Sequence, residues 1–401
     1  MSKISAILGK WSDTSLVLRI AIGLVIGAVL GLTVPQWTGI GLLGHLFVSA
    51  LKAIAPVLVA FLVSSSIAKA QGGLGPRFRT VIVLYLSATL VAAAVAVAGS
   101  FLFPVTLDLK DAASGSAPGG LADVFRHLLS NMVMNPVQSI ATANYIGILF
   151  WAIIVGLGLK LVASNSTIKL ISEISDVITQ VVKWIIQFAP FGILGLVFTA
   201  VSESGLEIFT TYGKLLLLLV GCMLTSVLVF NPLISFIATR RNPYPLLLTC
   251  LKESGINAFF TRSSAANIPI NMELCKKLGI EEDFYSVSIP LGATVNMNGA
   301  AVTITVMTLA VAHTMGIEVS FASALFLSVI ATLGACGASG VAGGSLLLIP
   351  MACSFFGIPV DVAMQAVAIG FIIGVIQDSV ETAVNSSGDV FFTATADRAA
   401  R

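Results

Sequence analysis

The most constraining feature of this sequence is a succession of apolar runs, each long enough to cross a lipid bilayer. The chain of 401 residues is 57% hydrophobic and only 10% charged, whereas soluble domains carry about 25% charged residues. A membrane-spanning helix needs about 20 mostly apolar residues. Eight runs fit this requirement, at 16–35, 41–69, 80–104, 144–164, 168–201, 212–238, 285–313 and 360–396. The sequence therefore predicts an all-α polytopic membrane protein with eight transmembrane helices.

Two further apolar stretches are interrupted near their middle by polar and small residues. The stretch 245–275, here called hairpin one, breaks at TRSSAANIP, and the stretch 321–357, here called hairpin two, breaks at GACGASGVAGG. Each half is too short to cross the membrane, so both stretches are expected to be re-entrant helical hairpins. Non-helical backbone at membrane depth is tolerated only inside protein or beside a water-filled cavity, which is where the two tips are expected.

The distribution of Lys and Arg predicts the orientation. With a cytoplasmic N-terminus and eight crossings, the outer side receives little beyond Lys110, Arg126 and Lys214. The inner side receives most of the remaining basic residues, among them Lys69, Arg77, Arg79, Lys160, Lys169, Arg240, Arg241, Lys276, Lys277 and Arg398. This asymmetry follows the positive-inside rule, so both termini are expected in the cytoplasm. Hairpin one then enters from the cytoplasm and hairpin two from outside.

A weak internal repeat follows the hairpins. Hairpin one precedes a helix containing NMNG at 296–299, and hairpin two precedes a helix containing NSSG at 385–388. Both helices are expected to be interrupted at this N-x-x-G motif. The opposite entry sides make the repeat inverted, and inverted repeats with broken helices are typical of secondary transporters.

The first apolar run carries Gly23, Gly27 and Gly31 at a spacing of four residues. Such rows of small residues allow close packing of membrane helices. The sequence leaves open whether this row packs within the chain, packs between subunits, or reflects an ordinary glycine content.

The last apolar run contains acids. Asp378, Thr382, Asn385 and Asp389 are spaced i, i+4, i+7 and i+11, and Glu381 borders them, so they form one stripe on a helix. A charged acid at the bilayer centre costs roughly 2.5–3.5 kcal/mol on insertion scales. The stripe must therefore face protein, water, cations or substrate. A structural polar network within a helix bundle is the alternative interpretation.

Ligands are the simplest source of compensating charge for these acids. Arg262, at the tip of hairpin one, is the only basic residue placed to help. Na⁺ prefers carboxylate, amide and carbonyl oxygens, and an unwound segment at 296–299 would supply the last. The helix that begins after Ser263 and Ser264 would offer N–H groups to an α-carboxylate. These features indicate a carrier that binds a cation together with an amino acid.

Other classes of function fit less well. The net charge of +2 and the lack of a dense basic cluster give no sign of nucleic-acid binding. A passive channel would not need gates on both sides. An intramembrane aspartyl protease needs acids on two facing helices, whereas these acids share one. An enzyme is therefore not expected.

The chain resembles a known family through TRSSAANIP, PLGATVNMNGAAVTI, GACGASGVAGG and QDSVETAVNSSGD. It is similar to the dicarboxylate/amino acid:cation symporters, and most of all to the bacterial sodium:serine/threonine symporters. The resemblance implies a homotrimeric, sodium-coupled symporter of the bacterial inner membrane. It also implies an elevator mechanism, in which a scaffold (16–69 and 144–201) holds a mobile transport unit (80–104 and 212–396) with the hairpins as gates.

The resemblance also implies roles for single residues. Asp378 matches the residue that binds the substrate ammonium, with Thr382 and Asn385 beside it. The other matched substrate contacts are Ser263, Ser264, Ala338, Ser339 and Gly340. One sodium site matches Asn296, Asn385 and Asp389. A second, built largely from backbone carbonyls, matches Thr294, Met297, Thr332, Leu333 and Ala335.

Departures from the family pattern bear on specificity and coupling. Glu381 stands where carriers of acidic amino acids have an arginine, which favours serine and threonine, whose hydroxyl group could donate to it. Ser339 replaces a proline of the second gate. Asn298 and Ala300 replace an aspartate and a hydroxyl residue of a third ion site, so one or two Na⁺ are expected. Glu381 is also expected to pair with Arg262 in the empty pocket. Proton coupling through Glu381, and transport of dicarboxylates or acidic amino acids, remain alternatives.

Overall fold

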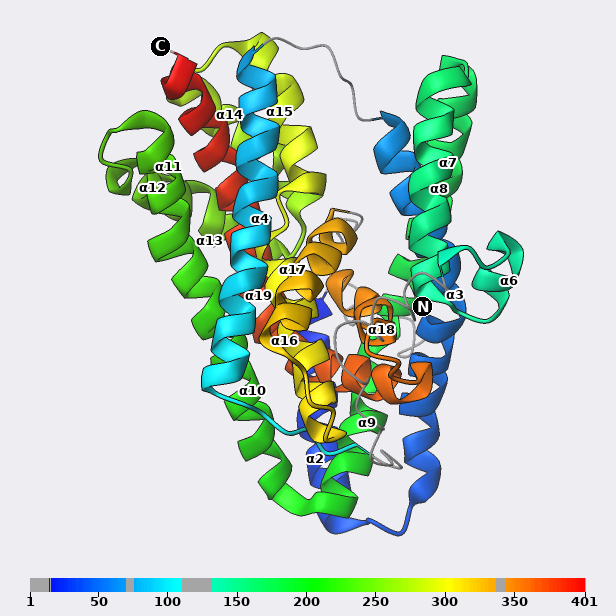
Figure 1. Ribbon diagram of the computed structural model, residues 1–401. Coiled ribbons are helices and arrows are strands. Elements are labelled where there is room, and N and C mark those ends of the chain that lie inside the picture. Colours follow the sequence, from blue (N-terminus) through cyan, green and yellow to red (C-terminus); the bar gives the residue numbers. More distant parts are fainter. Residues whose placement is uncertain (1–13, 15, 70–75, 110–131, 337–342, 401) are drawn as a thin grey trace, which may run out of the picture.

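The computed structural model describes residues 14, 16–69, 76–109, 132–336 and 343–400, and these residues form helices and connections without any strand (Figure 1). The helices before the hairpins are α2 (Leu16–Thr33), α3 (Gly41–Lys69), α4 (Pro76–Leu102), α6 (Pro136–Ala141), α7 (Tyr145–Val162), α8 (Asn165–Gln187), α9 (Ala189–Ser204), α10 (Ile208–Thr225) and α11 (Asn231–Thr239). The remainder are α12 (Tyr244–Cys250), α13 (Ile256–Thr261), α14 (Ser264–Lys277), α15 (Glu282–Val295), α16 (Asn298–Thr314), α17 (Phe321–Ala335), α18 (Ile349–Ser354) and α19 (Val360–Ala400). The all-helical prediction is confirmed for the described residues.

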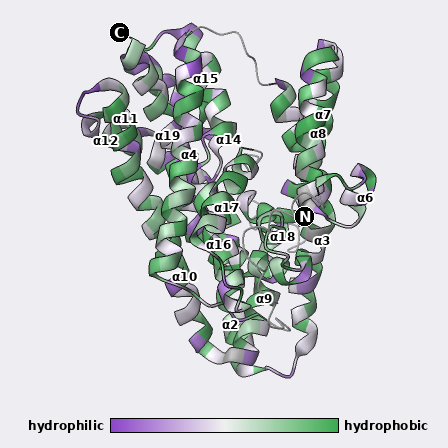
Figure 2. Ribbon diagram, in the orientation of Figure 1, coloured by the Kyte–Doolittle hydropathy of each residue, from purple (hydrophilic) through white to green (hydrophobic). Residues whose placement is uncertain are grey.

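The helices are apolar along most of their length, and hydrophilic residues gather near helix ends and connections (Figure 2). Among the described residues, five helical segments are long and apolar enough to cross a membrane, and six if α8 and α9 form one bent span. The apolar helices α2 and α7 are shorter, at 18 residues each. These features fit a polytopic membrane protein.

The predicted span at 168–201 is not one straight helix. It consists of α8 and α9, which are bent by 53° at Phe188. Pro190 lies in the first turn of α9, where a proline fits a helix start but cannot continue the preceding hydrogen-bond ladder. Pro190 therefore accounts for the bend, which the hydropathy of the segment does not predict.

The helices pack in two groups. In the first, α2 packs against α9, and α3 packs against α7, α8 and α9. In the second, α16 and α19 lie at the centre and contact α4, α10, α15, α17 and α18. Figure 1 shows α3, α7 and α8 as one column beside the larger body that contains α4, α14 and α15. Fewer contacts join the groups, and they run chiefly from α19 to α9, α2 and α3, from α18 to α7, and from the 3₁₀ turn η5 (Ser345–Leu348) to α3.

The glycine row of α2 packs within the chain. A Cβ atom at Gly23, Gly27 or Gly31 would collide with backbone carbonyl oxygens of α9, at Pro190, Leu194 and Phe198 respectively. The three glycines therefore allow α2 and α9 to approach at backbone distance, which decides between the alternatives that the sequence left open.

Hairpin one reverses at Arg262 and Ser263. Arg262 ends α13 in the left-handed conformation (φ 52°), and Ser263 is extended (φ −148°). The Ser263 side chain caps α14 by accepting a hydrogen bond from Ala266 N at 3.2 Å, which is the usual role of serine at this position. The first arm also contains a π-helical turn, η4 (Leu251–Gly255). In hairpin two, α17 forms the first arm, and the 3₁₀ turn η5 (Ser345–Leu348) leads into α18.

Only one of the two predicted helix interruptions is present. Asn296 and Met297 leave helical geometry between α15 and α16. The expected break at 385–388 is wrong, because α19 is helical throughout Val360–Ala400. The physical reason lies in what the NSSG residues contact. Ser387 Oγ donates back to Ala383 O at 2.6 Å within the helix. A Cβ atom at Gly388 would lie 2.6 Å from Asn296 Nδ2, so this glycine admits a neighbouring side chain rather than ending the helix.

Candidate functional site

The acidic stripe of α19 lies inside the protein. Asp378, Glu381, Thr382, Asn385 and Asp389 are all buried, with Asp389 fully so. The elements around them are hairpin one, the break between α15 and α16, the first turns of α16, and η5 of hairpin two. The prediction that the stripe avoids lipid is thus confirmed, and each acid is surrounded by different groups.

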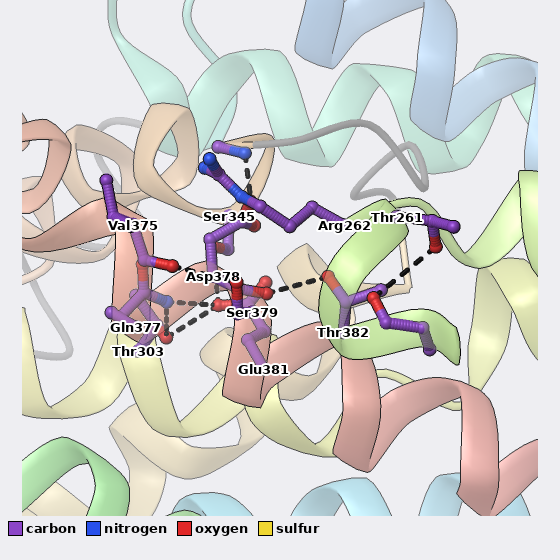
Figure 3. Close-up of polar contacts among 12 residues, drawn as sticks. Thr261, Arg262, Thr303, Ser345, Val375, Gln377, Asp378, Ser379, Glu381 and Thr382 are labelled. Atoms are coloured by element: carbon purple, nitrogen blue, oxygen red, sulfur yellow. Dashed lines mark hydrogen bonds and ion pairs between the residues drawn. The ribbon is translucent and has the colours of Figure 1, made fainter. Parts of the chain in front are cut away.

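Asp378 is held by the two hairpins. Arg262 Nε donates to Asp378 Oδ2 at 2.7 Å, and both side chains are more than nine-tenths buried. Gly343 N donates to Asp378 Oδ1 at 3.2 Å. The expected pair between Arg262 and Glu381 is therefore wrong for this conformation. The physical reason is the position of Asp378, which lies one helical turn before Glu381 on α19. Arg262, whose backbone is in the left-handed conformation, reaches that earlier turn (Figure 3).

Glu381 instead receives three hydrogen bonds on one oxygen. Thr303 Oγ1, Ser345 Oγ and Gln377 Nε2 donate to Glu381 Oε2 at 2.7, 2.8 and 2.6 Å. Sequence reasoning did not include these three donors among the site residues. The contact from Gln377 could have been predicted from the sequence, because Gln377 lies four residues before Glu381 on the same helix. Thr303 and Ser345 come from α16 and hairpin two, and no spacing in the sequence indicates their approach.

The first predicted sodium site is brought together. Asn296 Nδ2 donates to Asp389 Oδ1 and to Asn385 O, both at 3.0 Å. Asn385 Oδ1 accepts from Gly299 N at 2.7 Å. Asn296 Oδ1 and Asp389 Oδ2 are fully buried and have no hydrogen-bond partner among the described residues. Orphaned amide and carboxylate oxygens are the ligand type that a hard cation prefers, so this group fits Na⁺.

The second predicted sodium site is assembled only in part. Its residues are Thr294, Met297, Thr332, Leu333 and Ala335. Met297 lies at the helix break and is buried, and Cys336 Sγ, just beyond α17, contacts Val295 O at 3.5 Å. The end of α17 therefore adjoins the break, as a site of backbone carbonyls requires. The side chains of Thr294 and Leu333 are exposed.

Asn298, one of the two residues expected to replace a third ion site, is engaged in hydrogen bonds. Thr89 Oγ1 donates to Asn298 Oδ1 at 3.0 Å, and Asn298 Nδ2 donates to Asn231 Oδ1 at 3.3 Å. Ala300 beside it is fully buried. The oxygen of Asn298 is thus engaged and carries no formal charge.

The substrate contacts predicted at the two hairpin tips lie only partly within the described residues. Ser264 is buried at the start of α14, and Ser263 Oγ is engaged in capping it. Thr382 Oγ1 donates to Asp378 O at 2.8 Å within α19. Ala338, Ser339 and Gly340 lie outside the described residues.

A second buried polar cluster joins hairpin one to α19. Asn267 Nδ2 lies within 3.0 Å of Ser254 Oγ and 2.8 Å of Ser386 Oγ. Asn271 Nδ2 donates to Ser386 O at 3.1 Å. Sequence reasoning did not include these residues, although Asn267 and Asn271 are four residues apart on a helix that enters an apolar region. The cluster ties both arms of hairpin one to the helix that bears the acids.

Comparisons with known proteins give one consistent result. A model described as the sodium:dicarboxylate symporter family matches residues 16–399. A Bifidobacterium adolescentis protein named serine/threonine transporter SstT is 60% identical over 388 residues, which are 96% of this chain and 90% of that protein. Proteins of the same name from Streptococcus agalactiae and Streptococcus thermophilus are 56% and 54% identical, each over 98% of both chains.

Proposed function

The chain belongs to the sodium:dicarboxylate symporter family, and from this premise we propose that it imports serine and threonine together with Na⁺. Relatives that it matches over nearly their whole length are named serine/threonine transporters. They are transporters and not enzymes. The observation that carries the proposal is the buried acidic stripe of α19, which gathers carboxylates and orphaned oxygens where α16 and both hairpins meet.

The substrate's ammonium group binds Asp378 in this proposal. Arg262 provides the positive charge next to Asp378 in the present conformation. An ammonium group replaces or shares that charge when an amino acid enters, so the carboxylate is never buried without a counter-charge. The need for such compensation is large, because an uncompensated buried charge costs several kcal/mol. The α-carboxylate binds at the N-terminus of α14, where backbone N–H groups and the helix dipole favour an anion.

Na⁺ binds as co-transported cargo between α15–α16 and α19. The proposed ligands are Asn296, Asn385 and Asp389, supported by the two orphaned oxygens described above. A second ion binds at the carbonyls of the helix break and α17, near Met297 and Thr332. The neutral, hydrogen-bonded Asn298 supports a count of one or two ions and not three.

Glu381 determines the class of side chain. A carboxylate at this position repels the second carboxylate of a dicarboxylate or acidic amino acid, and like charges at short range cost several kcal/mol. A hydroxyl group can donate a hydrogen bond to it. Small hydroxyl amino acids are therefore the proposed substrates.

The larger arrangement is proposed from family membership together with the packing. We propose eight membrane spans and two re-entrant hairpins in the bacterial inner membrane, with both termini cytoplasmic. The group α2, α3, α7, α8 and α9 is the proposed scaffold of a homotrimer, and the group around α16 and α19 is the unit that moves as an elevator. The smaller contact between these groups supports such sliding.

Uptake by proteoliposomes tests the proposal. Purified protein should accumulate radiolabelled serine against its gradient when Na⁺ is imposed outside, and threonine should compete while aspartate should not. Replacing Na⁺ with choline at constant pH should abolish uptake. Uptake that persists in choline and follows a proton gradient would favour proton coupling, and competition by aspartate or succinate would favour an acidic substrate. A dependence of serine uptake on three Na⁺ would contradict the ion count.

A further inference from the structure

The carboxylate of Glu381 is bound asymmetrically. Its Oε2 atom receives all three hydrogen bonds, from Thr303, Ser345 and Gln377. Its Oε1 atom receives none from the described residues, and it is not one of the fully buried orphaned atoms. A carboxylate oxygen accepts only a few hydrogen bonds, so Oε2 is saturated and Oε1 is left for another donor. Figure 3 shows Glu381 together with Thr303, Ser345 and Gln377.

The three donors also constrain one another. Gln377 Nε2 donates both to Glu381 Oε2 and to Thr303 Oγ1, the latter at 2.7 Å. Thr303 Oγ1 accepts that bond and donates its own hydroxyl hydrogen to Glu381 Oε2. The reverse amide orientation would place the carbonyl of Gln377 against the carboxylate, so the network permits a single arrangement. Gln377 Oε1 is buried and has no partner among the residues that the structure describes, a cost that an apolar side chain at 377 would avoid.

Backbone packing fixes the remaining freedom of Glu381. A Cβ atom at Gly299 would lie 2.8 Å from Glu381 Cα and 3.0 Å from Glu381 Cγ. The first turn of α16 therefore lies directly against the stem of this side chain. With the stem confined and one oxygen saturated, the other oxygen has a defined position and direction.

We propose that Thr303, Gln377 and Ser345 are positioning residues that aim Glu381 Oε1 at the hydroxyl group of the substrate. This inference rests on the proposed function and predicts that the site prefers serine and threonine to alanine. A hydroxyl donor meets an acceptor already held in place, so little side-chain entropy is lost on binding. Alanine leaves that acceptor without a partner.

Ser345 connects the three-donor network to hairpin two. It lies in η5, directly after the tip of hairpin two, whereas Thr303 and Gln377 lie on α16 and α19. The network is therefore complete only when hairpin two is packed against α19.

The experiment compares substrate preference in reconstituted variants. Thr303→Val, Gln377→Leu and Ser345→Ala should each lower the serine-over-alanine ratio of kcat/KM by about tenfold, the effect expected for losing roughly one hydrogen bond to a charged group. Alanine uptake should change little. Thr303→Ser should restore the preference, because it keeps the hydroxyl group. Thr305→Val is the matched control, since Thr305 is fully buried on the same helix and its hydroxyl group has no partner within the described part of the chain.

The outcomes separate the inference from the proposed function. Wild-type protein that takes up no serine overturns the proposed function. Wild-type uptake with an unchanged serine-over-alanine ratio in all three variants overturns the inference alone. Equal losses for serine and alanine, without rescue by Thr303→Ser, would assign the network to stability and also overturn it.

Discussion

Arg262 and Asp378 form a buried ion pair, with Nε 2.7 Å from Oδ2, that ties the tip of hairpin one to the middle of α19. The pair joins a residue in the left-handed conformation at a helix end to a carboxylate on another helix 116 positions later in the chain. It occupies the carboxylate to which the proposed substrate ammonium binds. The pair therefore couples the stability of the fold to the proposed substrate site.

Replacing Arg262 with Gln should make the protein depend on its substrate for stability. The buried Asp378 would lose its counter-charge, which costs about 3–5 kcal/mol when one partner of a buried pair is removed. Serine would restore part of that loss through its ammonium group, so the serine-induced rise in melting temperature should exceed that of the wild type. Thermal unfolding in detergent, with and without serine, measures this.

Arg240→Gln is the control for this prediction. Arg240 also ends a helix in the left-handed conformation, but it is exposed. Its replacement should leave the melting temperature and the serine-induced shift unchanged. A serine-induced shift in Arg262→Gln no larger than in the wild type would separate Arg262 from substrate binding.

Asp389→Asn should weaken Na⁺ binding more than serine binding. The substitution removes the charge from a group whose Oδ2 atom is orphaned and buried, and the loss of a ligand charge should raise the half-saturating Na⁺ concentration by about 10–100-fold. At saturating Na⁺, the KM for serine should change little. Uptake as a function of Na⁺ concentration measures the effect. Ser379→Ala serves as control, because the one hydrogen bond of Ser379 Oγ to the described residues goes to Val375 O of its own helix.

Gly388→Ala should affect the same ion site through sterics alone. A Cβ atom at this position would lie 2.6 Å from Asn296 Nδ2 and would push that side chain away from Asp389. Half-saturating Na⁺ should rise by about tenfold, the size of effect seen when a supporting contact of a metal site is lost. At Gly374, on the same helix, an added Cβ meets nothing within 4 Å. Gly374→Ala should leave Na⁺ dependence unchanged; similar behaviour of the two variants would argue against the steric account.

Gly23→Ala should loosen the contact between α2 and α9. The added methyl group would strike the carbonyl oxygen of Pro190, and overpacking of this kind costs about 1–3 kcal/mol. Gly158→Ala in α7 meets no atom within 4 Å and should be neutral or slightly stabilising, because alanine is the better helix former. Thermal unfolding of both variants compares them. Equal melting temperatures would mean that α2 and α9 are not held at this distance.

Several features of the fold were predictable because their physical causes are local. Hydropathy predicted helices across most of the spans, and the polar interruptions predicted the turn at Arg262 and Ser263. Other features depend on neighbours. The NMNG and NSSG motifs share their first and last residues, yet only the first interrupts a helix. The polar groups of the second are met by α16, by hairpin one and by its own helix, so the helix continues.

The sequence by itself determined that this chain is a helical membrane protein, and that one face of its last apolar helix carries acids that must be buried. Those conclusions follow from composition and from the helical period, which are properties of contiguous residues. Only the tertiary structure decided that Arg262 reaches Asp378 and not Glu381, and that Thr303 and Ser345 meet on Glu381. Such contacts join residues far apart in the chain, and a shift of one helical turn in packing would exchange their partners.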